Sequence, residues 1–160
     1  MIALKKITWD NFKEICDLEI HEHQKKYVDS NLKCLAKAYV DFKTMGAKSF
    51  EYGIYASGEL IGFVMLEYKD SERSLLPDKS PFYIIWEFMI DKNHQGKGFG
   101  CSAMIKIIEH LKTRPEGDAK SVIIPHEPEN LIVSKLYASL GFEKIDPVSS
   151  EEYEYIQLKF

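Results

Sequence analysis

The 160-residue sequence lacks the features that define several large classes of protein. It has only three cysteines, which are widely separated and fit no metal-binding or redox spacing, so we expect free thiols in a reducing compartment. No apolar run approaches the length that crosses a membrane, and the N-terminal residues lack the pattern of a cleavable signal peptide. These absences predict a cytoplasmic protein with no metal site and no membrane partner.

The sequence also lacks an excess of basic residues. Its 21 Lys and Arg residues are outnumbered by 25 Asp and Glu residues, which gives a net charge of −4 and argues against nucleic acid as a partner. A hydrophobic content of 45% and a charged content of 29% are typical of a globular protein. The length predicts one domain over residues 1–160 with a substantial core.

Hydrophobic periodicity and turn residues predict seven strands and four helices. The expected strands are residues 2–7, 52–56, 60–68, 82–90, 121–124, 142–145 and 153–159. The expected helices are residues 11–19, 101–111, 130–140 and a second helix that is capped by Ser30 and runs to about residue 45, with Leu32 and Tyr39 on its buried stripe. Pro125 is expected to stop the fifth strand. Antiparallel strands therefore precede strand–helix–strand units, an order that predicts an α/β sandwich built on a mixed sheet.

The most informative stretch runs from Ile90 to Gly100, between a predicted strand and a predicted helix. Three glycines at alternate positions let the backbone turn tightly with its N–H groups exposed, and a helix N-terminus attracts anions, phosphate above all. A P-loop needs Gly-Lys-Ser/Thr at the start of the helix, and a dinucleotide loop needs Gly-x-Gly-x-x-Gly. Neither register fits, because Cys101 stands where the third dinucleotide glycine should be. The remaining pattern, Gln95-x-x-Gly98-x-Gly100, predicts a pyrophosphate cradle.

This pattern resembles the acyl-CoA pyrophosphate loop of the GNAT N-acetyltransferases, which is Gln/Arg-x-x-Gly-x-Gly/Ala. Downstream, Asn130 to Phe142 resembles their fourth-helix motif, Asn-x-x-Ala-x-x-Leu-Tyr-x-x-x-Gly-Phe, with Val133 in place of the usual small residue. With the order of elements, the resemblance covers essentially the whole chain. It implies an α/β (α+β) GNAT fold, a mixed, mostly antiparallel seven-stranded sheet with helices on both faces.

The resemblance implies acetyl-CoA as the cosubstrate. The positions that match the family's donor site are Met89, Ile90, Gln95, Gly96, Lys97, Gly98, Phe99, Gly100 and Asn130. The backbone of the first two is expected to hydrogen-bond the pantetheine arm and to polarise the acetyl carbonyl. Asn130 would also contact that arm, although a plain helix cap is an alternative.

Two side chains are the candidates for acid–base chemistry. Tyr137 matches the family tyrosine whose hydroxyl points at the thioester sulfur and can protonate the departing thiolate; a packed core aromatic is the alternative. Glu87 is the only charged residue between Pro81 and Asp91, in a strand that otherwise consists of Phe, Tyr, Ile, Trp and Met. Such a carboxylate can bind an ammonium group and remove its proton, unless it is a structural residue satisfied by its neighbours. The sequence does not assign a role to His126.

The first half of the chain also resembles, more narrowly, the bacterial spermine/spermidine acetyltransferases, at residues 21–28, 34–38, 55–63 and 88–91. A polyamine acceptor needs carboxylates along its path. Besides Glu87, the candidates are Glu22 and Glu67, with Gln24 and Tyr27 at the entrance. Glu22 and Gln24 could equally be ordinary surface residues.

These observations predict acetyl-CoA-dependent N-acetylation of a small primary amine, a polyamine, by direct attack in a ternary complex. No covalent enzyme intermediate is expected, because the sequence has no Ser or Cys nucleophile motif. Acetylation of a peptide, protein or antibiotic amine is an alternative, and a non-catalytic acyl-CoA sensor is an alternative of another class. Homodimers are common in the family, and nothing in the sequence decides the oligomeric state.

Overall fold

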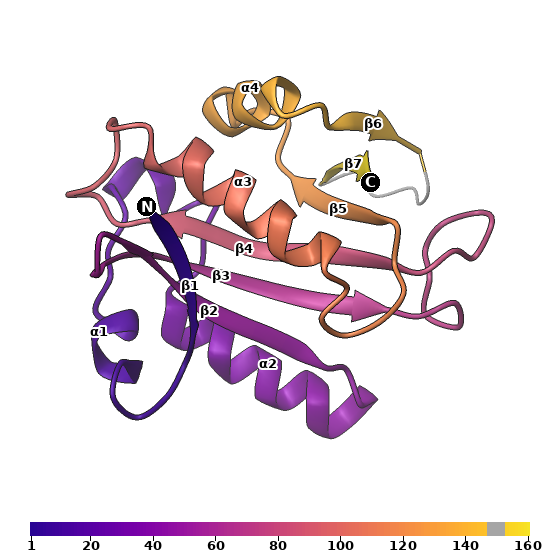
Figure 1. Cartoon of the computed structure of the whole chain (residues 1–160), viewed down its shortest axis with the longest axis horizontal. Helices are drawn as coiled ribbons and strands as arrows, with labels where there is room; N and C mark the ends of the chain where they lie inside the picture. Colours follow the sequence, from indigo (N-terminus) through magenta and orange to yellow (C-terminus); the bar gives the residue numbers. More distant parts are fainter. Residues whose placement is uncertain (147–152) are drawn as a thin grey trace. The chain divides into compact units, whose positions relative to one another are not determined.

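Strands and helices follow one another in the predicted order in the computed structural model, which describes residues 1–146 and 153–160 (Figure 1). The helices are α1 (Phe12–Cys16), α2 (Asn31–Met45), α3 (Phe99–Lys112) and α4 (Leu131–Ser139), with a 3₁₀ helix η1 (Glu22–Gln24). The strands are β1 (Ile2–Lys6), β2 (Ser49–Ala56), β3 (Glu59–Lys69), β4 (Phe82–Ile90), β5 (Ser121–His126), β6 (Glu143–Ile145) and β7 (Glu154–Lys159). None of these helices is long and apolar enough to cross a bilayer.

Hydrogen bonds join the seven strands in the order β1-β2-β3-β4-β5-β7-β6. The pair β4–β5 is parallel, whereas β1–β2, β2–β3, β5–β7 and β6–β7 are antiparallel. This mixed, mostly antiparallel sheet confirms the predicted fold class. The chain divides into a first unit, Met1–Glu67 with Glu87–Ile107, and a second unit, Tyr68–Trp86 with Ile108–Phe160. Each unit is described by itself.

In the first unit, α1 and α2 pack on one face of the strands. Figure 1 shows α2 lying along β2 and β3. The core of this face consists of Ile15, Cys34, Phe63, Met65 and Met89. Burying these side chains stabilises the unit by about 1.5–3 kcal/mol for each large apolar one.

The buried face of α2 differs from the predicted stripe. Leu32 and Tyr39 are 56% and 64% exposed, so their predicted burial was wrong. Asn31 and Cys34 face the core in their place. The reason is polar: the amide of Asn31 is buried and donates to the carbonyl oxygen of Ile15 at 2.7 Å, which fixes the rotation of the helix. The hydrophobic periodicity of the sequence gives no sign of this bond.

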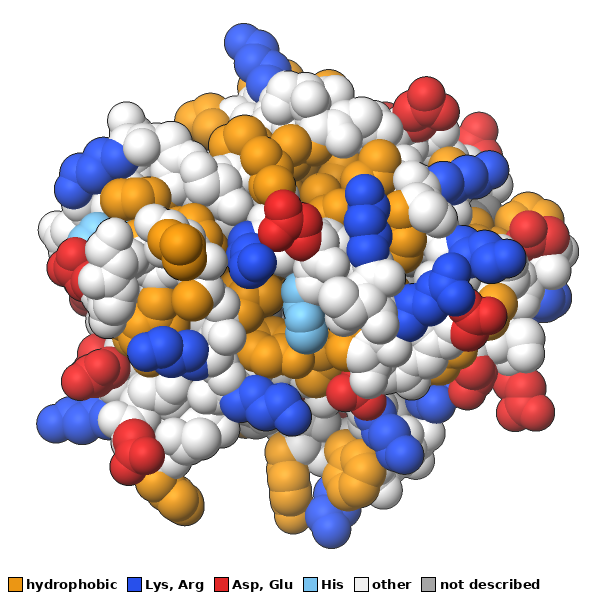
Figure 2. Space-filling model, in the orientation of Figure 1, with side chains coloured by type: hydrophobic (Ala, Val, Ile, Leu, Met, Phe, Trp, Pro, Cys, Tyr) orange, Lys and Arg blue, Asp and Glu red, His pale blue; other side chains and the backbone are white. Residues whose placement is uncertain are grey.

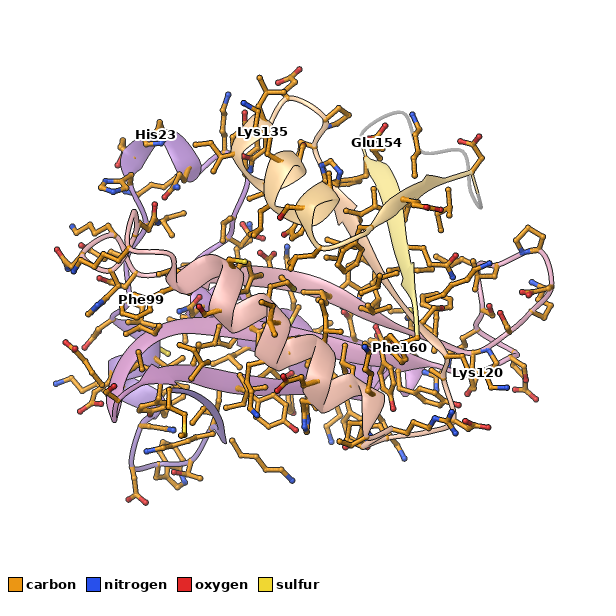
Figure 3. The ribbon with its side chains drawn as sticks, turned by 45° about the horizontal axis from the view of Figure 1, so that its top comes forward. His23, Phe99, Lys120, Lys135, Glu154 and Phe160 are labelled. Carbon is orange, nitrogen blue, oxygen red and sulfur yellow. The ribbon has the colours of Figure 1, made fainter. Side chains whose placement is uncertain are left out.

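The second unit has its own apolar cluster, formed by Leu76, Phe82, Ile84 and Ile123. Strand β5 does not stop at Pro125 as predicted but continues to His126, because β7 pairs with it as far as the His126–Glu154 row. A proline is compatible with a strand where its missing N–H is not needed. At the other end of this unit, Phe160 donates its backbone N–H to the carbonyl oxygen of Lys120 at 2.9 Å, and Figure 3 shows the two residues side by side.

The surface charge is mixed. On the face shown in Figure 2, basic and acidic side chains are interspersed among the described residues. This agrees with the small net charge of −4. Recognition of a charged molecule therefore depends on local groups instead of a broad field over this face.

Candidate active site

The glycine-rich loop joins β4 to α3 in the first unit. Gly96 and Gly98 have φ angles of +74° and +79°, a left-handed conformation that L side chains rarely adopt. The first helical hydrogen bond of α3 runs from Ser102 N–H to the carbonyl oxygen of Gly98, at 3.3 Å. The N–H groups that precede Ser102 in the helix are thus available to an anion at the positive end of the helix dipole. A Cβ added at either left-handed glycine would meet no atom within 4 Å, so the space above the loop is open.

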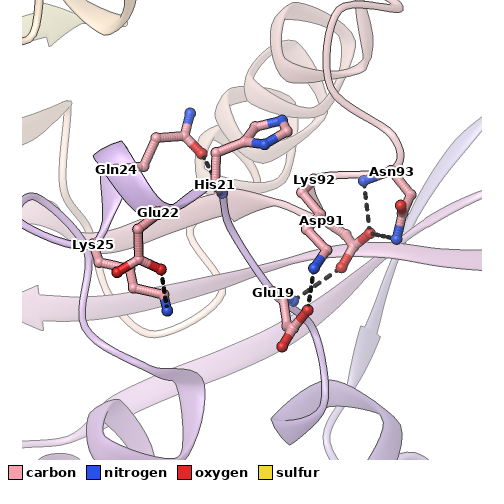
Figure 4. Close-up of polar contacts among 8 residues, drawn as sticks. All are labelled: Glu19, His21, Glu22, Gln24, Lys25, Asp91, Lys92 and Asn93. Carbon is pink, nitrogen blue, oxygen red and sulfur yellow. Dashed lines mark hydrogen bonds and ion pairs between the residues drawn. The ribbon is translucent and has the colours of Figure 1, made fainter.

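A buried carboxylate, Asp91, holds the start of this loop (Figure 4). One of its oxygens accepts from the backbone and side-chain amides of Asn93, at 3.0 and 2.9 Å. The other accepts from Glu19 N–H at 2.9 Å, and Lys92 N–H donates back to the Glu19 carbonyl oxygen at 2.7 Å. Although burial acts in the opposite direction, the hydrogen bonds from Glu19 and Asn93 hold the pKa of Asp91 below its ordinary value.

The predicted donor-site side chains are placed as follows. Gln95 donates to the Ile90 carbonyl oxygen at 2.8 Å and is paired with the amide of Gln24. Lys97 folds back to donate to the Asn93 carbonyl oxygen at 2.8 Å. Phe99, labelled in Figure 3, is the first residue of α3. Met89 is buried in the core of the first unit, so only its backbone could face a ligand.

Glu87 is half-buried on β4 and lies beside α2. The thiol of Cys34 hydrogen-bonds to its carboxylate. Burial, followed by the charge of Glu87, raises the pKa of Cys34 to about 12, so this thiol stays protonated and remains a donor at neutral pH. One turn further along α2, hydrogen bonding to Asp29 raises the pKa of Lys37, and the charge of Glu87 adds to that rise. Glu87 thus has a neutral donor and a cation on its α2 side.

Three carboxylates project from the same face of the first unit's strands. Met65 belongs to the cluster under α1 and α2, and Glu51 stands directly opposite it on β2. Glu67 follows Met65 by two residues and Glu87 precedes Met89 by two, so both share that face. Burial raises the pKa of Glu51. Sequence reasoning missed Glu51, because the second strand begins at Ser49 instead of the predicted residue 52.

The remaining predicted acceptor residues lie on or next to η1. Glu22 is exposed and forms an ion pair with Lys25, with 2.6 Å between nitrogen and oxygen. Tyr27 is half-buried, and the ammonium of Lys26 lies 4.6 Å from the centre of its ring. The amide of Gln24 is engaged with Gln95, as described above. Glu67 is 5% exposed on β3.

In the second unit, Tyr137 is buried on α4 between two rings. The rings of His126 and Phe142 lie 5.9 and 5.8 Å from it, measured between ring centres. Nδ1 of His126 lies 3.1 Å from the carbonyl oxygen of Glu127, a geometry in which this nitrogen donates. Nε2 of His126 then faces the carboxylate of Glu154 at 3.7 Å. The hydrogen bond from Lys144 to that carboxylate, followed by charge, holds the pKa of Glu154 below its ordinary value.

Asn130 occupies the N-cap position of α4, but its side chain makes no capping hydrogen bond. Its backbone carbonyl oxygen accepts from both the N–H and the hydroxyl of Ser134, each at 3.0 Å. The carbonyl of Asn130 therefore accepts the first hydrogen bond of the helix, whereas its side chain caps none of the N–H groups at the helix start.

A hollow of about 880 Å³ lies at the other end of β5 from these groups. Its floor contains Ser121 and Gln157, which are hydrogen-bonded to each other at 2.9 Å. Because Ser121 begins β5 and His126 ends it, the hollow is roughly 17 Å along the strand from the ring that contacts Tyr137. The hollow is therefore separate from the candidate groups on α4 and at the end of β5. Within residues 1–146 and 153–160, no three His, Cys, Asp or Glu side chains are grouped to hold a metal ion.

Comparison with known proteins bears on the family and the fold of this chain. The model of the acetyltransferase (GNAT) family matches residues 4–142. A probable spermine N(1)-acetyltransferase of Bacillus subtilis subsp. natto (strain BEST195) is 29% identical over 150 residues, which cover 89% of this chain and 88% of that protein. The spermine/spermidine N(1)-acetyltransferase of Bacillus subtilis (strain 168) matches with the same identity and coverage. The solved structure of aminoglycoside acetyltransferase AAC(6')-Ib with coenzyme A has a TM-score of 0.74 at 18% identity, over 99% of this chain and 95% of that one, which supports the fold alone.

The role of Asp91 in holding the loop can be tested by its pH signature. A lowered pKa stabilises the folded state above the unfolded-state pKa of about 3.9, and this contribution is lost as pH falls through the folded-state pKa. We expect Asp91→Asn to lower the free energy of unfolding by about 1–3 kcal/mol at neutral pH, because an amide cannot accept all three hydrogen bonds. This loss of free energy of unfolding should shrink on acidification, as measured by urea denaturation.

An equal loss at low and neutral pH would contradict this role of Asp91. The control is Asp41→Asn, which changes an exposed carboxylate of α2.

Proposed function

This chain belongs to the acetyltransferase (GNAT) family, and we propose that it transfers the acetyl group of acetyl-CoA to a primary amine of a polyamine such as spermidine or spermine. The observation that carries the choice of acceptor is the set of three carboxylates, Glu51, Glu67 and Glu87, on one face of the first unit. The support from relatives is the 29% identity to two proteins named as spermine or spermine/spermidine acetyltransferases.

The donor loop fits a pyrophosphate. Its left-handed glycines leave open space, and the first N–H groups of α3 lie beside them at the positive end of the helix. We propose that Gln95 to Gly100 hold the pyrophosphate of acetyl-CoA, which supplies the activated acetyl group as a thioester. In the same assignment, Asn130 and the backbone of Met89 and Ile90 hold the pantetheine arm.

The acceptor needs both charge and apolar surface, because a polyamine alternates ammonium groups with short methylene chains. The carboxylate face supplies both. Glu51 stands opposite Met65, and Glu67 follows Met65 by two residues, so acidic side chains lie next to apolar ones on this face. We further propose that Glu22 and Tyr27, on and next to η1, line the entrance to this path.

Proton transfers at Glu87 and Tyr137 complete the reaction. Glu87 accepts the proton that the acceptor ammonium must lose before its nitrogen attacks the acetyl carbon. The carbon–sulfur bond then breaks, and the hydroxyl of Tyr137 gives its proton to the departing sulfur. The new amide nitrogen loses its second proton as the bond breaks, and this proton restores the Tyr137 hydroxyl, directly or through solvent. The attack is direct in a ternary complex, so no acyl group is carried by the protein.

A homodimer is not required by this scheme, since every group that it uses belongs to one chain. We also propose that the protein works in the cytoplasm, where its three cysteines are free.

A thiol-release assay tests this function directly. The protein is mixed with acetyl-CoA and a panel of spermidine, spermine, an aminoglycoside, amino acids and an N-terminal peptide. We expect release of CoA with the polyamines, at a kcat/KM at least tenfold above that for the other amines, because only a polyamine places ammonium groups along several carboxylates. Turnover of the aminoglycoside or the peptide alone would replace the polyamine with that acceptor. Binding of CoA without turnover of any amine would indicate a sensor.

The acid role of Tyr137 has a separate test. Tyr137→Phe removes only the hydroxyl and keeps the ring that packs against His126 and Phe142. We expect kcat to fall by about 10²-fold or more, because a positioned acid typically contributes 10²–10⁴-fold, while the affinity for acetyl-CoA stays unchanged. Steady-state kinetics and calorimetric titration with CoA measure the two quantities. An unchanged kcat would remove Tyr137 from the mechanism.

A further inference from the structure

Two segments of the first unit that are far apart in the sequence are tied together at two points. One is residues 19–28, which includes η1 and which the proposed function assigns to the acceptor entrance. The other is residues 90–98, the donor loop. The first tie is a pair of hydrogen bonds, from Glu19 N–H to the carboxylate of Asp91 at 2.9 Å and from Lys92 N–H to the carbonyl oxygen of Glu19 at 2.7 Å, together with an ion pair between the side chains of Glu19 and Lys92 (Figure 4).

The second tie is a reciprocal amide pair between Gln24 and Gln95. Nε2 of Gln24 donates to Oε1 of Gln95 at 3.0 Å, and Nε2 of Gln95 donates to Oε1 of Gln24 at 2.9 Å. Oε1 of Gln24 also accepts from His21 N–H at 3.0 Å, a bond drawn in Figure 4. Both acceptor positions of that oxygen are therefore used inside the protein.

This use of the Gln24 amide bears on its function. A side chain whose oxygen is saturated cannot also accept a hydrogen bond from an acceptor ammonium. Gln24 instead bonds to the start of η1 through His21 N–H and to Gln95, the first residue of the donor-loop motif. Gln95 in turn donates to the Ile90 carbonyl oxygen at 2.8 Å, which extends the connection to the end of β4. Gln24 is thus placed to transmit the position of one segment to the other.

We propose that the Gln24–Gln95 pair couples the two substrates: filling of the donor loop orders residues 19–28, which prepares the acceptor entrance. Gln24 is a positioning residue in this assignment, since it acts through Gln95. The inference rests on the proposed function for the identity of the two segments.

The physical basis is a shared ordering cost. Ile20 and Val28, near the two ends of residues 19–28, pack partly buried against the apolar core, but most side chains between them are exposed. Little apolar burial therefore holds the middle of the segment, which contains η1, in place. A ligand on the donor loop fixes the backbone around Gln95. This also fixes the side-chain amide of Gln95, to which Gln24 of η1 is hydrogen-bonded. The second ligand then meets a segment that is already ordered, which produces positive coupling between the two sites.

Hydrogen–deuterium exchange with coenzyme A alone tests this coupling without any assumption about the acceptor. In the native protein, we expect CoA to slow amide exchange both in residues 95–101 and in residues 19–28. In Gln24→Met, which keeps the length of the side chain but removes the amide, residues 95–101 should still be protected while residues 19–28 lose at least half of their added protection. Lys13→Met, on the exposed side of α1 in the same unit, is the matched control and should behave like the native protein.

The outcomes separate the two proposals. If CoA protects residues 95–101 but changes nothing in residues 19–28 of the native protein, the coupling is refuted and the proposed function stands. If protection of both segments is the same in Gln24→Met, the amide pair is not the connection and the coupling as proposed is also refuted. If CoA protects neither segment at saturating concentration, the donor site itself is wrong, and the proposed function falls with the coupling. Gln24→Ala provides a second variant should Gln24→Met fail to fold.

Discussion

The geometry of the first unit depends on one buried carboxylate, Asp91, at the point where β4 becomes the donor loop. A buried charge is tolerated only where donors satisfy it, and here three N–H groups do so, from Glu19 and from Asn93. Because one oxygen serves the loop and the other serves the segment before η1, a single side chain sets the position of both. The Gln24–Gln95 pair adds a second connection, five residues further along the first segment and four residues further along the second, so that hydrogen bonds join the loop to the segment at two points.

From this constraint the proposed chemistry follows in steps. The fixed loop presents its left-handed glycines and the N-terminus of α3 to an anion, which suits the donor. The strand that leads into the loop carries Glu87 on the face that also bears Glu51 and Glu67, which suits a cation. The protonated thiol of Cys34 donates one hydrogen bond to Glu87. The carboxylate has further lone pairs and can still accept a proton. The proposed anion and cation sites thus lie on the same strand and its continuation.

The sequence predicted what is locally encoded. The order of elements, the glycine turn before α3 and the helix cap at Ser30, which accepts from Lys33 N–H at 3.3 Å, all follow from short-range preferences. Contacts between residues far apart in the sequence could not be predicted. Gln24 and Gln95 are 71 residues apart, and the residues around each of them do not indicate the other. The same holds for Asn31, whose long-range bond rotated α2 away from the predicted stripe, and for Glu51, which only the β2–β3 register brings opposite Met65.

The central claim is that Glu87 takes the proton from a cationic amine held by the carboxylate face. The pH dependence of kcat for spermidine in the native protein, Glu87→Gln and Glu51→Gln tests it most directly, since kcat reports groups that titrate in the substrate complex. We predict that Glu87→Gln loses the rising limb of the profile and lowers kcat by about 10²–10⁴-fold, whereas Glu51→Gln raises KM and keeps the limb. A Glu87→Gln profile that matches the native one in shape and height would contradict the account.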